Sequence, residues 1–202
     1  SGNVRQKLRT AQRVAARDPF FTGNVDALIA AQPKDLEASE IEVRLGATWF
    51  DKKYIEQFMY ETFETPRYLR GQIEISYVPY TAEWQVSRKS MVRYNDVAAF
   101  TTYGTDRASA YRLLEDALNL RDIRIYDTIE DADGRERRVL NAKETTLAAQ
   151  KQQLIRDAFK DWIWKDPERR ETLVRQYNEE MNSTRPREYD GSHIVFSGMN
   201  PE

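Results

Sequence analysis

Residues 51–86 read DKKYIEQFMYETFETPRYLRGQIEISYVPYTAEWQV and contain the two patterns that decide the fold class. Asp51 can cap a helix over 52–64, in which apolar side chains recur every three or four residues. Residues 72–78 and 82–86 then alternate between apolar and polar side chains, which is the pattern of a β-hairpin. A helix followed by an antiparallel hairpin predicts an α+β fold.

The same order recurs downstream. Asp106 can cap a helix over 107–119, and a second hairpin follows, with its strands around 123–126 and 136–140. Asp133-Gly134 is the dipeptide that suits the tight turn between them. The two helix–hairpin units predict an antiparallel sheet built by internal duplication. A chance recurrence of this common motif is the alternative.

Helices are predicted on both sides of these units. Residues 3–17 and 24–31 have one apolar face each, and Asn3 and Asn24 are the expected caps. Between the second of these helices and the first unit, the alternation of residues 41–45 predicts a short strand.

Two further helices are predicted near the C-terminus. Asn141 should cap a helix over 142–164, with Leu147 and Leu154 on its apolar face. Asp166-Pro167 should start a helix over 167–181, in which Met181 is expected to be buried.

These elements predict one α+β domain over residues 1–182, flanked by helices at both ends. Its predicted parts are a helical N-terminal arm (1–33), the two helix–hairpin units (34–94 and 95–140) and an antiparallel helix pair (141–182). Residues 183–202 are polar and are predicted to be an extended linker.

The composition excludes several function classes. The chain has 202 residues, with 31 Lys and Arg against 33 Asp and Glu, and this balance argues against a generally basic nucleic-acid binder. The absence of cysteine excludes disulfides and thiolate chemistry, and it fits a reducing, cytoplasmic compartment. No apolar run approaches the roughly 20 residues that span a bilayer, so no membrane association is expected.

Motifs for catalysis are missing from the sequence. The glycine spacing matches neither a Walker loop nor a Rossmann fingerprint. Residues 131–136 resemble a calcium loop only weakly, and their arginines favour a hairpin turn. Asp190, Ser192 and His193 are too close in sequence for a catalytic triad and fit a polar linker. The sequence therefore predicts no catalytic residue, no cofactor and no metal.

Basic and aromatic residues instead suggest contact with DNA. Phosphate contacts use Lys and Arg, and exposed aromatic rings can stack on bases. Trp162 and Trp164 either fill the joint between the last two helices or present such a ring. The basic clusters are the face of the first helix (Arg5, Lys7, Arg9, Arg13, Arg17), the group Arg67, Tyr68 and Arg70, and the tail residues Arg185 and Arg187.

An ordered set of motifs resembles one known family. The motifs are QPKDL (32–36), RLGATW (44–49), TYGT (102–105), DWIW (161–164), NSTRPREYDGSH (182–193) and GMNPE (198–202). This set is similar to the middle region of large proteins of bacterial mobile elements and phages. Those proteins combine an adenine-specific DNA methylase with a Swi/Snf-like superfamily-two helicase.

The resemblance implies that this chain, which begins at Ser1, is a connecting piece of a longer protein without either catalytic centre. We therefore expect a non-catalytic domain that engages DNA or couples the methylase to the helicase. The linker over 183–202 would lead toward the helicase. The partners would be DNA and the adjoining helicase and methylase domains. A structural spacer or protein-docking domain without DNA affinity is the alternative.

Overall fold

The computed structural model describes residues 3–184, whose contacts divide into two compact units. The first unit joins the residues up to Leu36 with those from Arg175 onward, and the second is Glu37–Val174. The sequence interpretation has a single domain over 1–182 instead. The difference has a physical cause, because every buried apolar side chain among the described residues lies between Ile41 and Leu173.

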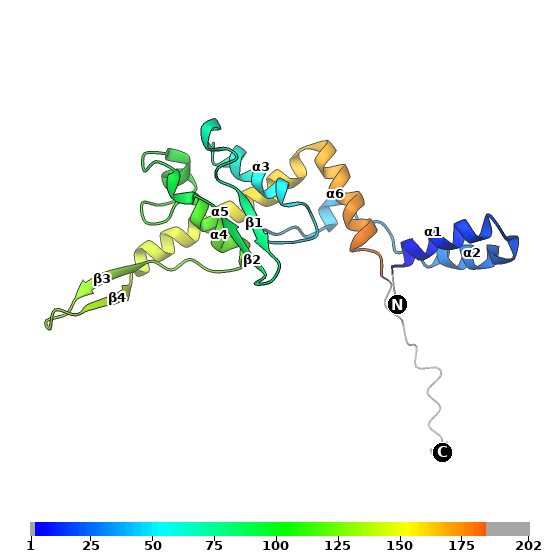
Figure 1. Cartoon of the computed structure of the whole chain (residues 1–202), viewed down its shortest axis with the longest axis horizontal. Helices are drawn as coiled ribbons and strands as arrows, with labels where there is room; N and C mark the ends of the chain where they lie inside the picture. Colours follow the sequence, from blue (N-terminus) through cyan, green and yellow to red (C-terminus); the bar gives the residue numbers. More distant parts are fainter. Residues whose placement is uncertain (1–2, 185–202) are drawn as a thin grey trace, which may run out of the picture. The chain divides into compact units, whose positions relative to one another are not determined.

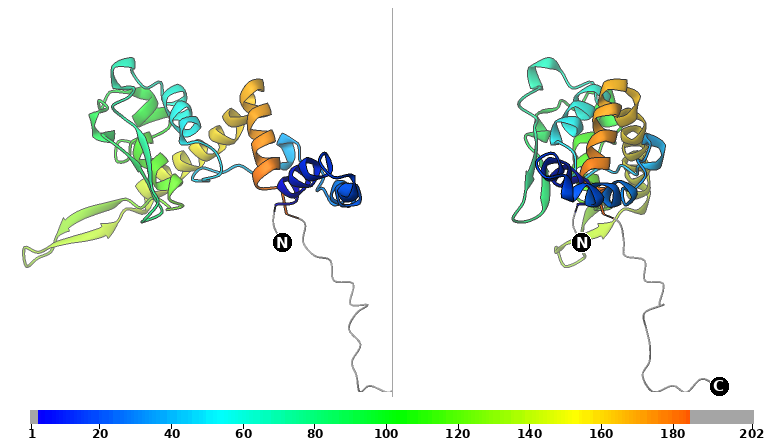
Figure 2. Two further views of the ribbon diagram at one scale, coloured as in Figure 1. Left: turned by 45° about the vertical axis from the view of Figure 1, so that its right-hand side comes forward. Right: turned by 90° about the vertical axis from the view of Figure 1, so that its right-hand side faces the viewer.

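Figure 1 labels the helices and strands, and Figure 2 gives two further views. They are α1 (Val4–Ala15), α2 (Thr22–Ala30), α3 (Lys52–Thr62), β1 (Ile75–Val78), β2 (Glu83–Val86), α4 (Ala110–Leu118), β3 (Tyr126–Glu130), β4 (Glu136–Leu140), α5 (Ala142–Lys165) and α6 (Pro167–Glu180). Single 3-10 turns cover Pro19–Phe21, Ala38–Glu40, Arg67–Leu69 and Lys89–Met91, and a short π-helix covers Ala98–Thr102. Helices combined with antiparallel hairpins confirm the α+β class.

Polar side chains cap three helices where the sequence predicts them. Asn3, Asp51 and Asn141 each accept a hydrogen bond from a backbone N–H in the first turn of α1, α3 and α5. Each cap satisfies a donor that has no partner within its helix. Asp166 does the same for α6, where its Oδ1 accepts from the N–H of Arg169 at 2.7 Å.

Two predicted caps are wrong. α2 begins at Thr22 rather than after Asn24, because the 3-10 turn just before it leads directly into the helix. α4 is capped by Ser109 rather than by Asp106. The reason is that the Thr105 hydroxyl accepts hydrogen bonds from the backbone N–H groups of Arg107 and Ala108, at 3.2 and 3.1 Å. These bonds hold the chain in a turn before the helix starts.

The two hairpins form separate two-stranded antiparallel sheets. In the first, Ile75 pairs with Val86 and Tyr77 with Trp84, and this hairpin packs against α3 and α4. The second hairpin, β3–β4, turns at Gly134 as expected and extends away from the helices of its unit (Figures 1 and 2). None of the residues in β3 or β4 is buried. The hairpins thus lie in different environments, and this difference does not support a duplicated core.

The predicted strand over residues 41–45 is wrong, although its alternation is real. Ile41, Val43 and Leu45 are 3–5% exposed, and the residues between them face solvent. The segment has no regular secondary structure, and it pairs with no strand among residues 3–184. Its alternation therefore reflects burial against the helical core without a hydrogen-bonded ladder.

Aromatic side chains form the centre of the second unit. Phe58 on α3 lies with its ring centroid 5.2 Å from that of Phe159 on α5 and 6.1 Å from that of Phe63. Phe63 in turn meets Tyr111 of α4 at 5.3 Å. This cluster holds three helices together.

Trp162 fills the joint between α5 and the start of α6. Its ring lies 5.7 Å from Phe58, and the Arg169 guanidinium lies 3.6 Å from its centroid. Its indole N–H donates to Glu61 Oε2 at 2.7 Å. These contacts confirm the packing role for Trp162, while Trp164 is half-buried.

Three predicted core residues near the C-terminus are exposed. Leu147 and Leu154 are 41% and 43% exposed, and Met181 is 52% exposed. α5 turns a neighbouring stripe inward, in which side chains recur every three or four residues. The buried residues of α5 are Ala148, Gln152, Ile155, Phe159 and Ile163.

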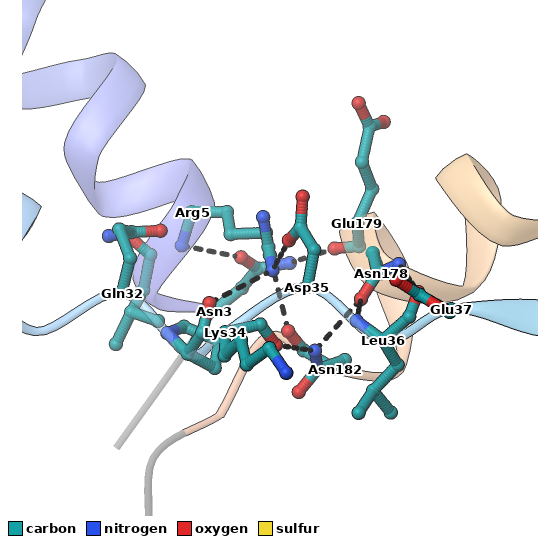
Figure 3. Close-up of polar contacts among 12 residues, drawn as sticks. Asn3, Arg5, Gln32, Lys34, Asp35, Leu36, Glu37, Asn178, Glu179 and Asn182 are labelled. Carbon is teal, nitrogen blue, oxygen red and sulfur yellow. Dashed lines mark hydrogen bonds and ion pairs between the residues drawn. The ribbon is translucent and has the colours of Figure 1, made fainter. Parts of the chain in front are cut away.

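The first unit is held by polar contacts (Figure 3). The Arg5 guanidinium pairs with Asp35 and donates to the Asn182 carbonyl oxygen at 3.2 Å. The Asn178 amide bonds both backbone groups of Leu36, at 2.8 and 2.9 Å. α1 and α2 bury no residue, so these polar contacts take the place of an apolar core.

Candidate nucleic-acid interface

A rigid turn after α3 carries the central group of predicted DNA contacts. Two residues after α3, Glu64 lies in the left-handed region at φ +50°, and the Thr65 N–H donates back to the Tyr60 carbonyl oxygen at 3.0 Å. Pro66 begins the 3-10 turn Arg67–Leu69. Thr65 and Leu69 are only 1% and 2% exposed, so both sides of the turn are anchored in the core.

Arg67 and Tyr68 lie on the outer side of this turn. Tyr68 is 62% exposed, and Arg67 is exposed as well. The Arg67 guanidinium forms no hydrogen bond or ion pair with any residue in the described range. A free cation beside a free aromatic ring, both on an anchored turn, can contact a phosphate and stack on a base.

Arg70, the third residue of this predicted group, makes contacts within the turn. Its Nε donates to the Thr65 carbonyl oxygen at 2.9 Å, and its guanidinium lies 5.9 Å from the centroid of the Tyr60 ring. Arg70 therefore braces the turn while its outer edge remains exposed.

A groove of about 380 Å³ lies beside the turn, along α3. Its lining residues are Lys52, Lys53, Glu56, Gln57, Tyr60, Glu61 and Arg70. Sequence reasoning missed the two lysines. Their signal was available, because two adjacent lysines in the first turn of a helix oppose the helix dipole, which the cap Asp51 offsets in part.

The groove contains three cationic side chains and two carboxylates, so its net charge is +1 and it favours an anion. The Lys52 ammonium donates to the Ile75 carbonyl oxygen at 2.8 Å and lies 3.8 Å from Glu56. The Tyr60 hydroxyl donates to the Ile73 carbonyl oxygen at 2.6 Å. Burial raises the pKa of Tyr60, so the ring stays neutral.

The other predicted clusters are the tail residues Arg185 and Arg187 and the basic face of α1. Arg185 and Arg187 lie outside the described residues, as do Asp190, Ser192 and His193. On α1, Arg5 is committed to the polar contacts of its unit, and Arg9 pairs with Glu179 at 2.9 Å. The guanidinium and ammonium groups of Lys7, Arg13 and Arg17 have no polar partner within residues 3–184.

Residues 3–184 contain neither a metal-binding cluster nor a membrane-spanning helix. No group of three His, Asp or Glu side chains in this range is placed to hold a metal ion. Over the same range, no helix is both long enough and apolar enough to cross a bilayer.

The described residues have an α+β fold with two separate hairpins, and the second unit carries a basic, aromatic turn on its surface. The model of one family, "Domain of unknown function (DUF8437)", matches residues 44–183. The match covers most of the chain, so this chain belongs to that family. Neither the curated proteins nor the solved structures contain a match.

Proposed function

We propose that this chain is a non-catalytic domain that engages DNA within a larger helicase–methylase polypeptide. By binding the DNA, this domain would couple the position of the DNA to the helicase. The protein would be located in the cytoplasm. The observation that carries the proposal is the anchored turn with Arg67 and Tyr68 free on its outer side. The resemblance of the ordered motifs to the middle region of such polypeptides supports the same function.

The binding mode follows from the chemistry of the turn. Arg67 would contact a phosphate, and Tyr68 would stack on a base of an unpaired strand. Lys53 on the neighbouring groove would add a second phosphate contact. Because Tyr68 can stack only on an unpaired base, single-stranded and forked DNA should bind more tightly than duplex.

Fluorescence anisotropy with single-stranded, duplex and forked DNA tests the proposal, at about 50 and 200 mM salt. Arg67→Glu should weaken binding to every DNA form and lower the salt slope by about one. Tyr68→Ala should weaken binding to single strands more than to duplex. Arg170→Glu is the matched control, because Arg170 is exposed on α6 and its guanidinium has no partner in the described part of the chain. Equal losses from the Arg67 and Arg170 reversals would reject the site.

A protein-docking function is the second candidate, and one observation favours it. A groove of about 570 Å³ lies along α1, with Ala11, Val14 and Phe21 among its lining. Phe20 and Ile29 nearby are 86% and 54% exposed. An absence of DNA binding at the lower salt would favour this function. The next experiment would then mix the chain with the adjoining helicase and methylase segments.

A further inference from the structure

A basic pocket lies on the second unit, apart from the turn described above. It has a volume of about 330 Å³. Three parts of the chain build it: the segment 41–45, the end of α4 and the middle of α5. Its lining residues are Glu42, Arg44, Leu45, Ala117, Leu120, Gln153, Arg156 and Lys160.

Three cationic side chains line this pocket, and the local structure explains their positions. Val43 and Leu45 are buried, whereas Arg44 between them is exposed and lines the pocket. Arg156 and Lys160 are four residues apart on α5 and therefore share one face of the helix. The pocket carries three cations and one carboxylate, in a chain whose net charge is −2.

These cations are poorly neutralised within the protein. Neither the Arg44 guanidinium nor the Lys160 ammonium forms a hydrogen bond or ion pair inside the described range. Among residues 3–184, Arg156 pairs only with Asp122, at 3.5 Å, and the Asp122 side chain is 88% exposed. Such an exposed pair contributes little stability. Like charges at positions i and i+4 also repel. An anion in the pocket would remove this repulsion.

The opposite wall is apolar and contains a strained residue. Leu45 and Ala117 form its buried part. Leu120 follows α4 with φ +56°, a conformation that favours glycine, and its side chain is 65% exposed. An exposed leucine in a strained conformation at the rim of a pocket is unfavourable to the free protein. An apolar ring that packed against the Leu120 side chain would remove this side chain from water and so gain binding energy.

We propose that this pocket binds a nucleoside monophosphate, either free or as the 5′ end of a strand. The phosphate pairs with Arg44, Arg156 and Lys160, because charge-assisted hydrogen bonds to guanidinium groups are strong. The base packs on Leu120. Glu42 and Gln153 supply polar groups for the sugar hydroxyls. The volume suits a ligand of this size.

Calorimetric titration of the full chain with AMP, adenosine and inorganic phosphate tests the proposal. AMP should bind at least tenfold more tightly than either adenosine or phosphate. Arg44→Gln and Arg156→Gln should each weaken AMP binding about tenfold. Lys143→Gln should not weaken it, because Lys143 is exposed on α5 outside the pocket. Arg67→Glu should also leave the affinity for AMP unchanged. The result for this pocket therefore does not depend on whether the turn with Arg67 and Tyr68 binds DNA.

Two further measurements sharpen the outcome. Leu120→Gly should raise the melting temperature while weakening AMP binding several-fold, a combination that loss of folding cannot produce. A tetranucleotide that binds only when it carries a 5′-phosphate would assign the pocket to a strand end. If AMP binds but the 5′-phosphorylated tetranucleotide does not, the pocket is assigned to the free nucleotide.

Three results would overturn the proposal. The first is no AMP binding at millimolar concentration, and the second is equal affinity for AMP and adenosine. The third is an affinity for AMP that Arg44→Gln leaves unchanged. Inorganic phosphate that binds as tightly as AMP would also overturn it, because the base would then contribute nothing to binding.

Discussion

Gly46 lies in a very close backbone contact of the second unit. Its φ is +85°, and a Cβ atom there would lie 2.1 Å from the carbonyl oxygen of Leu118 at the end of α4. Neither atom can move without displacing the helix or the buried segment 41–45. Any side chain at this position therefore disturbs the packing of α4.

Gly46→Ala should lower the free energy of unfolding far more than Gly71→Ala. Gly71 has a similar φ of +80° but open space around it, so its substitution costs only the backbone strain, about 1–2 kcal/mol. The clash at Gly46 should add about 2 kcal/mol or more. Urea denaturation of both variants measures the difference. Equal losses would show that the close contact with Leu118 is absent.

Tyr111 should make stability fall at alkaline pH. Burial raises its pKa to about 12, and its hydroxyl lies 2.7 Å from Thr65 Oγ1. The folded chain therefore holds this proton more tightly than the unfolded chain, whose tyrosines titrate near pH 10. The contribution of Tyr111 is complete below about pH 10 and is lost as the pH rises toward 12.

Tyr111→Phe should flatten this alkaline decline and cost about 1 kcal/mol at neutral pH. The cost arises because the Thr65 hydroxyl keeps only a 3.4 Å contact with the Met59 carbonyl oxygen. Urea denaturation across the alkaline range measures both effects. Tyr80→Phe serves as the control, since Tyr80 is 98% exposed and should change neither quantity. A decline of unchanged steepness in Tyr111→Phe would contradict the assignment.

At the scale of elements, Asn141 joins the β3–β4 hairpin to α5. Its Oδ1 accepts from the Glu144 N–H at 3.0 Å, and its Nδ2 donates to Asp127 Oδ2 at 2.8 Å. Hydrogen bonds from Arg107 and Asn141 lower the pKa of Asp127, so this carboxylate stays charged at the base of the hairpin. One side chain thus starts the helix and holds the hairpin.

Asn141→Ala should destabilise the protein by about 1 kcal/mol, the usual cost of a lost helix cap. Asn141→Ser should recover most of this loss, since a serine hydroxyl can cap α5 but does not reach Asp127. Hydrogen exchange in β3 and β4 should rise in both variants. Exchange that rises only in the alanine variant would show that the contact with Asp127 does not hold the hairpin.

At the scale of the whole molecule, the two units differ in what stabilises them. The second has an apolar core between Ile41 and Leu173, whereas the first depends on the contacts of Arg5, Asn178 and Asn182. Polar contacts near the surface contribute less than buried apolar area. The first unit should therefore open more readily than the second.

Hydrogen exchange measured by mass spectrometry should show this difference directly. Amides of α1 and α2 should exchange much faster than those of α4 and α5. Arg5→Ala should speed exchange in α1 and α2 further and leave α4 unchanged, because the guanidinium bonds only residues of the first unit. Lys7→Ala is the control, since its ammonium has no partner among the described residues. Comparable protection in all four helices would contradict this division.

The sequence by itself determined the local structure. The caps Asn3, Asp51 and Asn141, the turn at Gly134 and the first hairpin could all be predicted, because these signals act between residues close in the chain. The α+β class followed from them. Arg67 and Tyr68 were found by the same kind of local pattern, a basic residue next to an aromatic one.

Only the tertiary structure decided which surfaces are covered. The alternation of residues 41–45 marked burial but not strand pairing, and Leu147 on the predicted apolar face of α5 is 41% exposed. The contact of Arg70 with Thr65 and the pocket of Arg44 and Arg156 likewise depend on the folded chain. The physical reason is that burial and convergence depend on contacts between residues far apart in sequence, and one sequence does not state which distant segments meet.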